Sequence, residues 1–361
     1  MSRVRLRGEE IRRFILDKVE THAGDVSKLA AAHFGVTRQA INKHLQRLAH
    51  EGSLRESGKT RSRSYKLAPL VNWDQAYEIT PDLEEHVVWR NDVSRVLGDQ
   101  PENVMDIWQY GFTEMFNNAK DHSDGSHIEV LIQRTATTTE MAIIDNGVGI
   151  FRKIQSALNL LDERHAVFEL AKGKLTTDPA RHSGEGVFFT SRMFDSFDIL
   201  SAGTYFSHEF GKDWDWVSER TEPEKARTSV WLKLNNHTSR TPEKIFDQFS
   251  SGDNYGFNKT MVPVRLAQYG NDKLISRSQA RRVVARIDLF KVVIFNFQDV
   301  PTIGQAFADE IFRVFAQEHP GMELFISHAN SEIKRMVARA KSGQAEREII
   351  EEAEAVLPSA F

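Results

Sequence analysis

The chain has 361 residues, a mass of 41.2 kDa and 40% hydrophobic residues, which is enough for two or three domains that each have a core. It contains no cysteine, which excludes disulfide bonds, thiolate nucleophiles and cysteine-ligated zinc sites. The sequence has neither a signal-peptide pattern nor an apolar stretch approaching about 18 residues, so we expect a cytoplasmic protein without a membrane segment.

The net charge of −4 conceals an uneven distribution. Residues 1–67 contain 15 Lys and Arg against 7 Asp and Glu, whereas the remainder contains 32 against 44. A basic end on an acidic body favours a local polyanionic partner, because Lys and Arg supply the sequence-independent attraction to phosphates. A solvated charged face explains the charge equally well.

The basic end has the pattern of three short helices and a hairpin. Apolar residues recur at helical spacing over 9–20, a second helix is expected over 26–34, and Thr37 is placed to cap a third helix over 38–48. The third helix has one apolar side and one polar side. Arg, Lys, Asn and Gln can pair with base edges in the major groove, and the polar side offers Arg38, Gln39, Asn42 and Lys43.

This segment resembles the winged helix-turn-helix superfamily over residues 8–68, through residues 34–45 and the basic hairpin of residues 54–67. The resemblance implies a domain over residues 1–68 that binds double-stranded DNA. It also implies that the polar side of the third helix approaches bases, while hairpin side chains contact phosphates, namely Arg55, Lys59, Arg61 and Arg63. Three-helix units also serve as protein-docking modules, and this alternative stays open.

Residues 69–83 are predicted to be a linker. Pro69 and Pro81 bracket an aromatic, acidic segment, and a helix is expected over 82–97. The segment either couples two domains or is a passive spacer whose aromatic residues pack on a neighbour.

A long helix is expected from Pro101 to about residue 124, and it contains Glu114 and Asn118. Because these residues are one turn apart, their side chains project from one face. An amide oxygen there can ligate magnesium while the carboxylate orients water. Such a pair on its own more often belongs to the solvent-exposed face of an amphipathic helix.

Two glycine-containing clusters follow in the sequence. Strands expected over 127–134 and 140–144 lead into Asp145-Asn-Gly-Val-Gly149, where the carboxylate can accept from the amine of adenine and the glycines let the backbone approach the ring. Gly184-Glu-Gly186 then opens a helix whose free amides can cradle phosphates. An isolated Asp-Asn-Gly is usually a hairpin turn, but the ordered set of clusters predicts a nucleotide pocket.

Residues 84–236 resemble the GHKL ATPase superfamily, which contains gyrase, heat-shock chaperone ATPases and histidine kinases. Residues 114–122 resemble its N box, the two glycine clusters resemble its glycine boxes, and residues 228–234 resemble its closing strand. The resemblance implies a GHKL (Bergerat) α/β sandwich over residues 84–238, with one mixed sheet covered by helices, and ATP and Mg²⁺ as cofactors.

Family roles transfer to this chain position by position. Asn118 would hold magnesium, Asp145 with Gly147 and Gly149 would hold adenine, and Thr228 would assist near adenine. Phosphates would lie at Gly184, Glu185 and Gly186, beneath a lid of residues 151–183 from which Lys172, Lys174 and Arg181 would meet phosphate. An arginine at 227 replaces the glycine that usually precedes the threonine.

The residue type at position 114 bears on whether the protein hydrolyses ATP. In the hydrolysing branches of the superfamily the N-box glutamate activates water, so its presence implies a catalytic role for Glu114. A two-component sensor is disfavoured because His208-Glu209 lies between phenylalanines in a loop or strand-like setting rather than in a helix.

After residue 254 another α/β unit is expected, with strands over 291–297 and 322–327 that alternate with helices over 303–318 and 331–341. This alternation predicts parallel pairing. Residues 299–312 resemble a STAS-like domain, to which we assign 255–361 together with a charged C-terminal helix. In STAS partners of GHKL kinases a hydroxyl at this helix start receives phosphate. Thr302 is the nearest candidate, and a plain helix cap is the alternative.

The sequence therefore predicts a multidomain α/β protein: a winged helix-turn-helix, a GHKL sandwich and a small STAS-like domain. We expect an ATP-binding, ATP-hydrolysing transcriptional regulator whose nucleotide state controls DNA or partner binding, and a homodimer by resemblance. The alternatives are a GHKL-type Ser/Thr kinase acting on its own STAS-like domain or a partner, and a non-enzymatic nucleotide-sensing adaptor.

Overall fold

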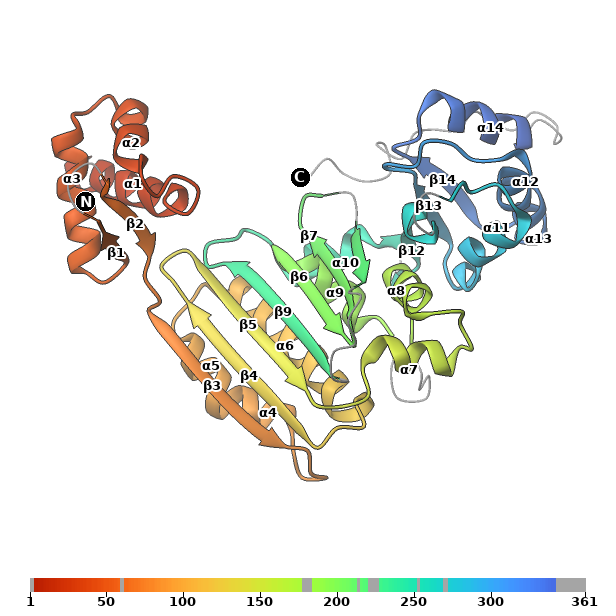
Figure 1. Cartoon of the computed structure of the whole chain (residues 1–361), viewed down its shortest axis with the longest axis horizontal. Helices are drawn as coiled ribbons and strands as arrows, with labels where there is room; N and C mark the ends of the chain where they lie inside the picture. The colour runs from red at the N-terminus through yellow and green to blue at the C-terminus, as the bar shows by residue number, and fades with distance from the viewer. Residues whose placement is uncertain are drawn as a thin grey trace.

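The computed structural model describes residues 3–58, 62–176, 184–212, 215–219, 227–251, 254–268 and 272–341. The chain is a multidomain α/β protein in which an N-terminal helical unit and a C-terminal α/β unit flank a large central sheet (Figure 1). None of the helices within these ranges combines the length and hydropathy that crossing a bilayer requires.

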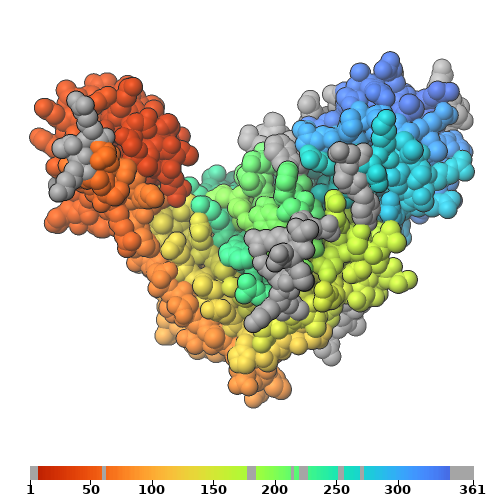
Figure 2. Space-filling model, in the orientation of Figure 1, coloured from red at the N-terminus to blue at the C-terminus, as the bar shows by residue number. Residues whose placement is uncertain are grey.

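The N-terminal unit consists of α1 (Arg3–Lys18), α2 (Val26–Phe34), α3 (Arg38–His50) and an antiparallel hairpin of β1 (Leu54–Ser57) and β2 (Ser64–Leu67). Helix α2 ends at Gly35, whose φ of 62° is left-handed, and the Thr37 side chain accepts a hydrogen bond from the Ala40 amide (3.2 Å). The predicted elements are confirmed. The unit has its own apolar core and projects from the rest of the molecule (Figure 2).

Strand β3 (Val71–Glu78) begins only three residues after the hairpin and forms the edge of the central sheet, antiparallel to β4 (His127–Arg134). The prediction of a linker over residues 69–83 is therefore wrong for these residues. The residues that pair between β3 and β4 are 49 to 63 positions apart in sequence, and local sequence patterns do not reveal such non-local pairing.

Within the described residues, the central sheet has seven strands in the order β3-β4-β5-β9-β6-β7-β8. Every neighbouring pair is antiparallel, whereas the sequence predicted one mixed sheet. The remaining strands are β5 (Thr138–Asp145), β6 (Ser196–Ser201), β7 (Thr204–Glu209), β8 (Asp215–Glu219) and β9 (Thr228–Asn235).

Helices cover one face of this sheet. A helical run of α4 (Glu85–Val88), a π-helical turn (Trp89–Val93) and α5 (Ser94–Leu97) lies beside the long helix α6 (Glu102–His122), behind the sheet in Figure 1. Helix α9 (Gly186–Met193) packs against α6. The Trp108 and Phe194 rings meet there edge to face, with their centroids 4.9 Å apart. Helix α10 (Pro242–Gln248) packs against both.

The C-terminal unit is built on parallel strands, as predicted. Strand β13 (Val292–Asn296) pairs with β12 (Lys259–Pro263) on one side and β14 (Glu323–Ser327) on the other. A small hairpin, β10 (Ser250–Ser251) and β11 (Asn254–Phe257), precedes them. The predicted charged helix after residue 341 lies outside the described residues.

Helices surround this parallel sheet. They are α11 (Arg277–Val284), α12 (Gln305–Asp309), α13 (Ala316–Glu318) and α14 (Ser331–Lys341). A π-helical turn (Glu310–Phe315) joins α12 to α13. Two 3₁₀ turns lie at Val264–Ala267 and Ile287–Leu289.

Two helices of the predicted lid connect the central and C-terminal units. Helix α7 (Ile150–Ala157) packs on α8 (Glu163–Lys172), and α8 packs on β12. Apolar residues of the central unit, of α8 and of the C-terminal unit belong to one continuous core. The C-terminal unit is therefore joined to the central unit by buried contacts, unlike the N-terminal unit.

Candidate functional site

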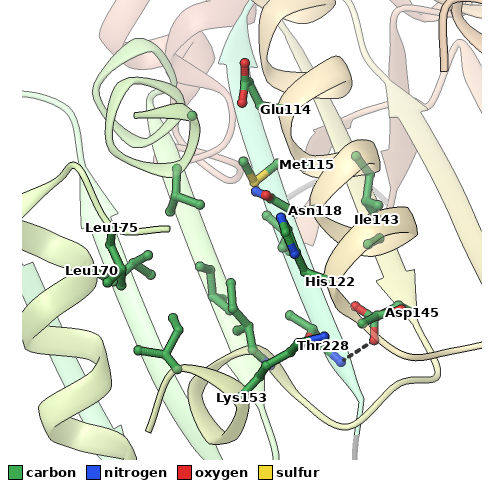
Figure 3. Close-up of a pocket in the computed structure, with 18 of the residues that line it drawn as sticks. Glu114, Met115, Asn118, His122, Ile143, Asp145, Lys153, Leu170, Leu175 and Thr228 are labelled. Atoms are coloured by element: carbon green, nitrogen blue, oxygen red, sulfur yellow. Dashed lines mark hydrogen bonds between the residues drawn. The ribbon is translucent and has the colours of Figure 1, made fainter. Parts of the chain in front are cut away.

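A cavity of about 250 Å³ lies between α6, the sheet and the segment around α7 and α8 (Figure 3). Six of the predicted site residues line it, from four separate stretches of sequence: Glu114, Asn118, Asp145, Gly184, Gly186 and Thr228. Gly147, Gly149 and Glu185 do not line the cavity. They belong to the turns that carry the lining residues.

At one end of the cavity, Asp145 is the last residue of β5 and lies opposite Thr228, the first residue of β9. Its Oδ1 accepts hydrogen bonds from the amides of Gly147 (2.9 Å) and Thr228 (3.3 Å). Burial to 6% exposure raises the pKa of the Asp145 carboxyl, and these two amide donors oppose the shift. A buried carboxylate thus faces the pocket from a rigid strand end.

The loop after Asp145 lies directly on the end of α6. A Cβ on Gly147 would be 2.1 Å from the carbonyl oxygen of Ser123, and the Val148 amide donates to that oxygen (2.9 Å). Only a glycine allows this backbone approach. Thr228 fixes the next part of the loop, since its Oγ1 accepts from the Ile150 amide (3.0 Å).

At the other end, Glu114 and Asn118 lie one turn apart along α6, with Glu114 far from Asp145 (Figure 3). A Cβ on Gly186 would lie 1.9 Å from Glu114 Oε2, so the carboxylate lies against the first turn of α9. The free amides and the positive dipole end of a helix favour anionic groups at this position.

Tyr110, one turn before Glu114 on α6, was missed by the sequence analysis. Burial raises the pKa of the Tyr110 phenol, and the Glu114 and Glu185 carboxylates raise it further. Burial also raises the pKa of Glu185, with Lys174 opposing that shift. The i, i+4 spacing from Tyr110 to Glu114 was visible in the sequence. The proximity of Tyr110 to Glu185, however, depends on how α9 packs against α6.

Half of the residues that line the cavity are apolar, and these were not predicted residue by residue. The apolar wall residues are Met115, Ala119, Ile143, Ile150, Ile154, Leu170, Leu175, Val187, Ile199 and Val230. Lys153 also reaches the wall from α7, where its Nζ donates to Asp124 Oδ2 (2.9 Å). Apolar walls around one carboxylate suit a flat heteroaromatic ring.

The predicted contact between Lys172 and phosphate is wrong. The Lys172 side chain is 2% exposed, and its Nζ donates to Glu169 Oε1 (2.7 Å) and to the carbonyl oxygens of Arg282 (3.1 Å) and Ala285 (2.9 Å). Burial lowers its pKa to about 8, and Glu169 opposes that shift.

Of the other two predicted lid cations, Lys174 is also directed to the C-terminal unit. Its Nζ donates to the Leu289 carbonyl oxygen (2.9 Å). Arg181 lies outside the described residues.

On the N-terminal unit, the predicted base-contacting residues Arg38, Gln39, Asn42 and Lys43 are all exposed on α3. Gln39 and Lys43 line a surface depression together with Arg12, Thr37, Ala40, His44 and Arg47. Burial lowers the pKa of His44, and Arg12 and Arg47 lower it further, which reflects the positive charge gathered here.

The predicted phosphate contacts of the hairpin differ in their surroundings. Arg55 is exposed on β1, whereas Arg63 is paired with Glu56 (2.9 Å). Lys59 and Arg61 lie outside the described residues.

Thr302 does not cap a helix. Its Oγ1 donates to Glu332 Oε1 (2.6 Å), and Gly304 occupies the N-cap position of α12. The capping alternative is therefore wrong, because the chain needs two more residues after Thr302 before the helix begins.

The C-terminal unit matches a described protein family. Residues 279–334 match the family model of a STAS-like domain of unknown function (DUF4325). The STAS-like prediction is confirmed for residues 279–334. Residues 259–341, which add β12 and the flanking residues to this match, are called the STAS-like unit below. No curated protein matches the chain.

Proposed function

We propose that the protein is a GHKL-type ATPase whose nucleotide state controls DNA binding by an N-terminal winged helix. One observation carries the proposal: Asp145, held by two backbone amides, opens into the same cavity as Glu114 and Asn118. The sheet with helices on one face also fits the α/β sandwich that the GHKL resemblance implies.

The two ends of the cavity suit the two ends of ATP. In this proposal the exocyclic amine of adenine donates to Asp145, and the apolar wall contacts the faces of the ring. The triphosphate lies toward the first turn of α9, near Gly184 and Gly186, where a helix N-terminus presents backbone amides to anionic groups. Asn118 would supply an amide oxygen to Mg²⁺, which neutralises phosphate charge.

Glu114 is the proposed general base. A water oxygen attacks the terminal phosphorus, the bond from that phosphorus to the bridging oxygen breaks, and ADP leaves with the bridging oxygen. Glu114 accepts the proton that the water loses. Tyr110 lies one turn away on α6, and the charge of the Glu114 carboxylate raises the pKa of its phenol.

Calorimetry with Mg·ATP tests the pocket. We expect heat of binding with the wild type and none with Asp145→Asn, and normal binding by that variant would reject the pocket assignment. Glu114→Ala should retain ATP and lose phosphate release, and unchanged release would reject the role of Glu114.

ATP labelled at its terminal phosphate distinguishes the remaining alternatives. Label released as free phosphate supports the ATPase. Label on protein supports a kinase acting on the STAS-like unit or a partner. Binding without turnover supports a non-enzymatic nucleotide-sensing adaptor.

The DNA-binding part of the proposal rests on α3. Three helices and a hairpin support the winged helix-turn-helix assignment. The exposed polar side of α3 carries donors and acceptors of the kind that pair with base edges, and basic residues surround it.

A further inference from the structure

Residues 163–176, here called the arm, consist of α8 and the residues that follow it. Leu170, Leu175 and Thr176 of the arm line the proposed ATP cavity. Other atoms of the same arm bond to the STAS-like unit. The arm therefore belongs both to the wall of the pocket and to an interface.

On the pocket side, the arm contacts the second glycine cluster backbone to backbone. The Leu175 amide donates to the Gly184 carbonyl oxygen (3.0 Å), and a Cβ on Gly184 would lie 2.5 Å from the Leu175 carbonyl carbon. Because both contacting groups belong to the backbone, rotating a side chain cannot compensate for a displacement of the arm at this point. A shift of the arm must therefore move the residues proposed to hold phosphate.

On the other side, hydrogen bonds cross from the arm to the STAS-like unit in both directions. Lys172 Nζ donates to the carbonyl oxygens of Arg282 (3.1 Å) and Ala285 (2.9 Å), while Thr260 Oγ1 donates to the Lys172 carbonyl oxygen (2.6 Å). Arg286 Nη2 donates to the Lys174 carbonyl oxygen (2.6 Å). Sequence separations of 88 to 113 residues make this a tertiary contact between two units.

These contacts are buried and charged. The Lys172 and Glu169 side chains are each 2% exposed, and Arg286 Nη1 lies 3.7 Å from Glu169 Oε2. Separating the arm from the STAS-like unit would leave a buried ammonium without two of its acceptors, which is strongly unfavourable. The arm is therefore expected to move together with the STAS-like unit rather than as an independent lid.

We propose that the STAS-like unit regulates the nucleotide site by positioning the arm, with Thr260, Lys172 and Arg286 as the positioning residues. This inference rests on the proposed ATP site. A change in the STAS-like unit that displaces β12 or the segment after α11 alters ATP affinity. By linkage, ATP alters the affinity of whatever binds the STAS-like unit by the same factor.

Hydrogen exchange of the full-length wild type, with and without a non-hydrolysable ATP analogue and Mg²⁺, tests the connection. We expect slower exchange in residues 163–176 and also in 259–263 and 282–290, with α14 as an internal control that does not change. Protection that stops at the arm would overturn the inference. An absence of binding in calorimetry would instead reject the proposed ATP site, so the two failures are distinguishable.

Thr260→Val gives a second test, because it removes one hydroxyl from a fully buried strand position while keeping a β-branched side chain. We expect ATP affinity to fall about 5- to 10-fold, the low range of allosteric coupling, at a temperature well below the melting transition. Thr260→Ser keeps the hydroxyl and should bind like the wild type.

Thr302→Val is the matched control, since it removes a hydrogen bond of the same 2.6 Å length within the STAS-like unit and away from the arm. The inference would be overturned if Thr260→Val bound ATP as tightly as the wild type. It would also be overturned if Thr302→Val lost as much ATP affinity as Thr260→Val. Lys172→Met should lose more ATP affinity than Thr260→Val. If Lys172→Met does not fold, the Thr260 variants alone test the inference.

Discussion

Glu114 and Gly186 are in contact at the end of the cavity remote from Asp145, where a Cβ on residue 186 would lie 1.9 Å from Glu114 Oε2. Gly186→Ala is therefore expected to displace the carboxylate. Because a positioned general base typically contributes about 10²- to 10⁴-fold, phosphate release should fall by at least about 100-fold. ADP should still bind, since the Asp145 end of the pocket, which is proposed to hold adenine, is untouched.

Gly256→Ala is the control for this substitution, because no atom lies within 4 Å of the Cβ it would add. Steady-state phosphate release and ADP titration of both variants check the prediction. Equal rates in Gly186→Ala and the wild type would show that Glu114 need not occupy this position during turnover.

Asp145 gives a prediction about pH. The ionised carboxylate is the form that accepts from adenine, and burial raises the pKa of Asp145 above its ordinary value of 3.8. ATP affinity should therefore decline on acidification at a higher pH than an exposed aspartate would cause. ATP titrations at a series of acidic pH values measure this, and a flat profile would contradict it.

The same shift predicts an effect on stability. An acid whose pKa is raised on folding binds its proton more tightly in the folded state, so its ionisation at neutral pH destabilises the fold. Asp145→Asn removes that cost and should raise the melting temperature of the nucleotide-free protein while ATP binding is lost. Thermal unfolding at pH 7 checks the sign, and a lower melting temperature would contradict it.

The sequence was informative where the relevant interaction is local. The helix end at Gly35 and the cap at Thr37 depend on residues within one turn. The shared face of Glu114 and Asn118 follows from helical periodicity alone. Asp145 was recognised at a strand end because the apolar strand pattern stops there.

Interactions between distant segments could not be predicted. Lys172 has the charge that phosphate attracts, but besides Glu169 it binds two backbone carbonyl groups some 110 residues away, in the C-terminal unit. Residues 71–78 combine exposed polar and half-buried aromatic side chains, and only their pairing with β4 identifies them as a strand. The Lys172 error came from assigning a role by residue type when burial decided it, and the error over residues 71–78 came from a pairing that the local sequence does not show.

Arg55 of β1, one of the predicted phosphate contacts, provides a test of the proposed DNA binding. Arg55→Ala should reduce the slope of log affinity against log salt by about 0.9. Lys334→Ala, on the exposed side of α14, is the control and should leave the slope unchanged. Fluorescence anisotropy with a labelled duplex measures both, and a wild-type slope near zero would favour the protein-docking alternative.

The junction between the N-terminal unit and the sheet is short and anchored on both sides. The Ala68 amide donates to the Ser53 carbonyl oxygen (3.0 Å), and the Leu70 amide donates to the Arg134 carbonyl oxygen (2.7 Å). Pro69 lies between them with its φ fixed by its ring. In the proposed function, this junction would be the covalent route by which a displacement of β3 reaches the hairpin and nucleotide state controls DNA binding.

Pro69→Gly should weaken that route by adding backbone freedom at one residue. We expect duplex affinity without nucleotide and ATP affinity to match the wild type, while the change in duplex affinity on adding Mg·ATP shrinks to within about twofold. Pro81→Gly, beyond the other end of β3, is the matched control and should keep the full response. Duplex titrations with and without Mg·ATP measure the response. A full response in Pro69→Gly would show that coupling bypasses the junction, and a wild type without any response would reject control of DNA binding by nucleotide.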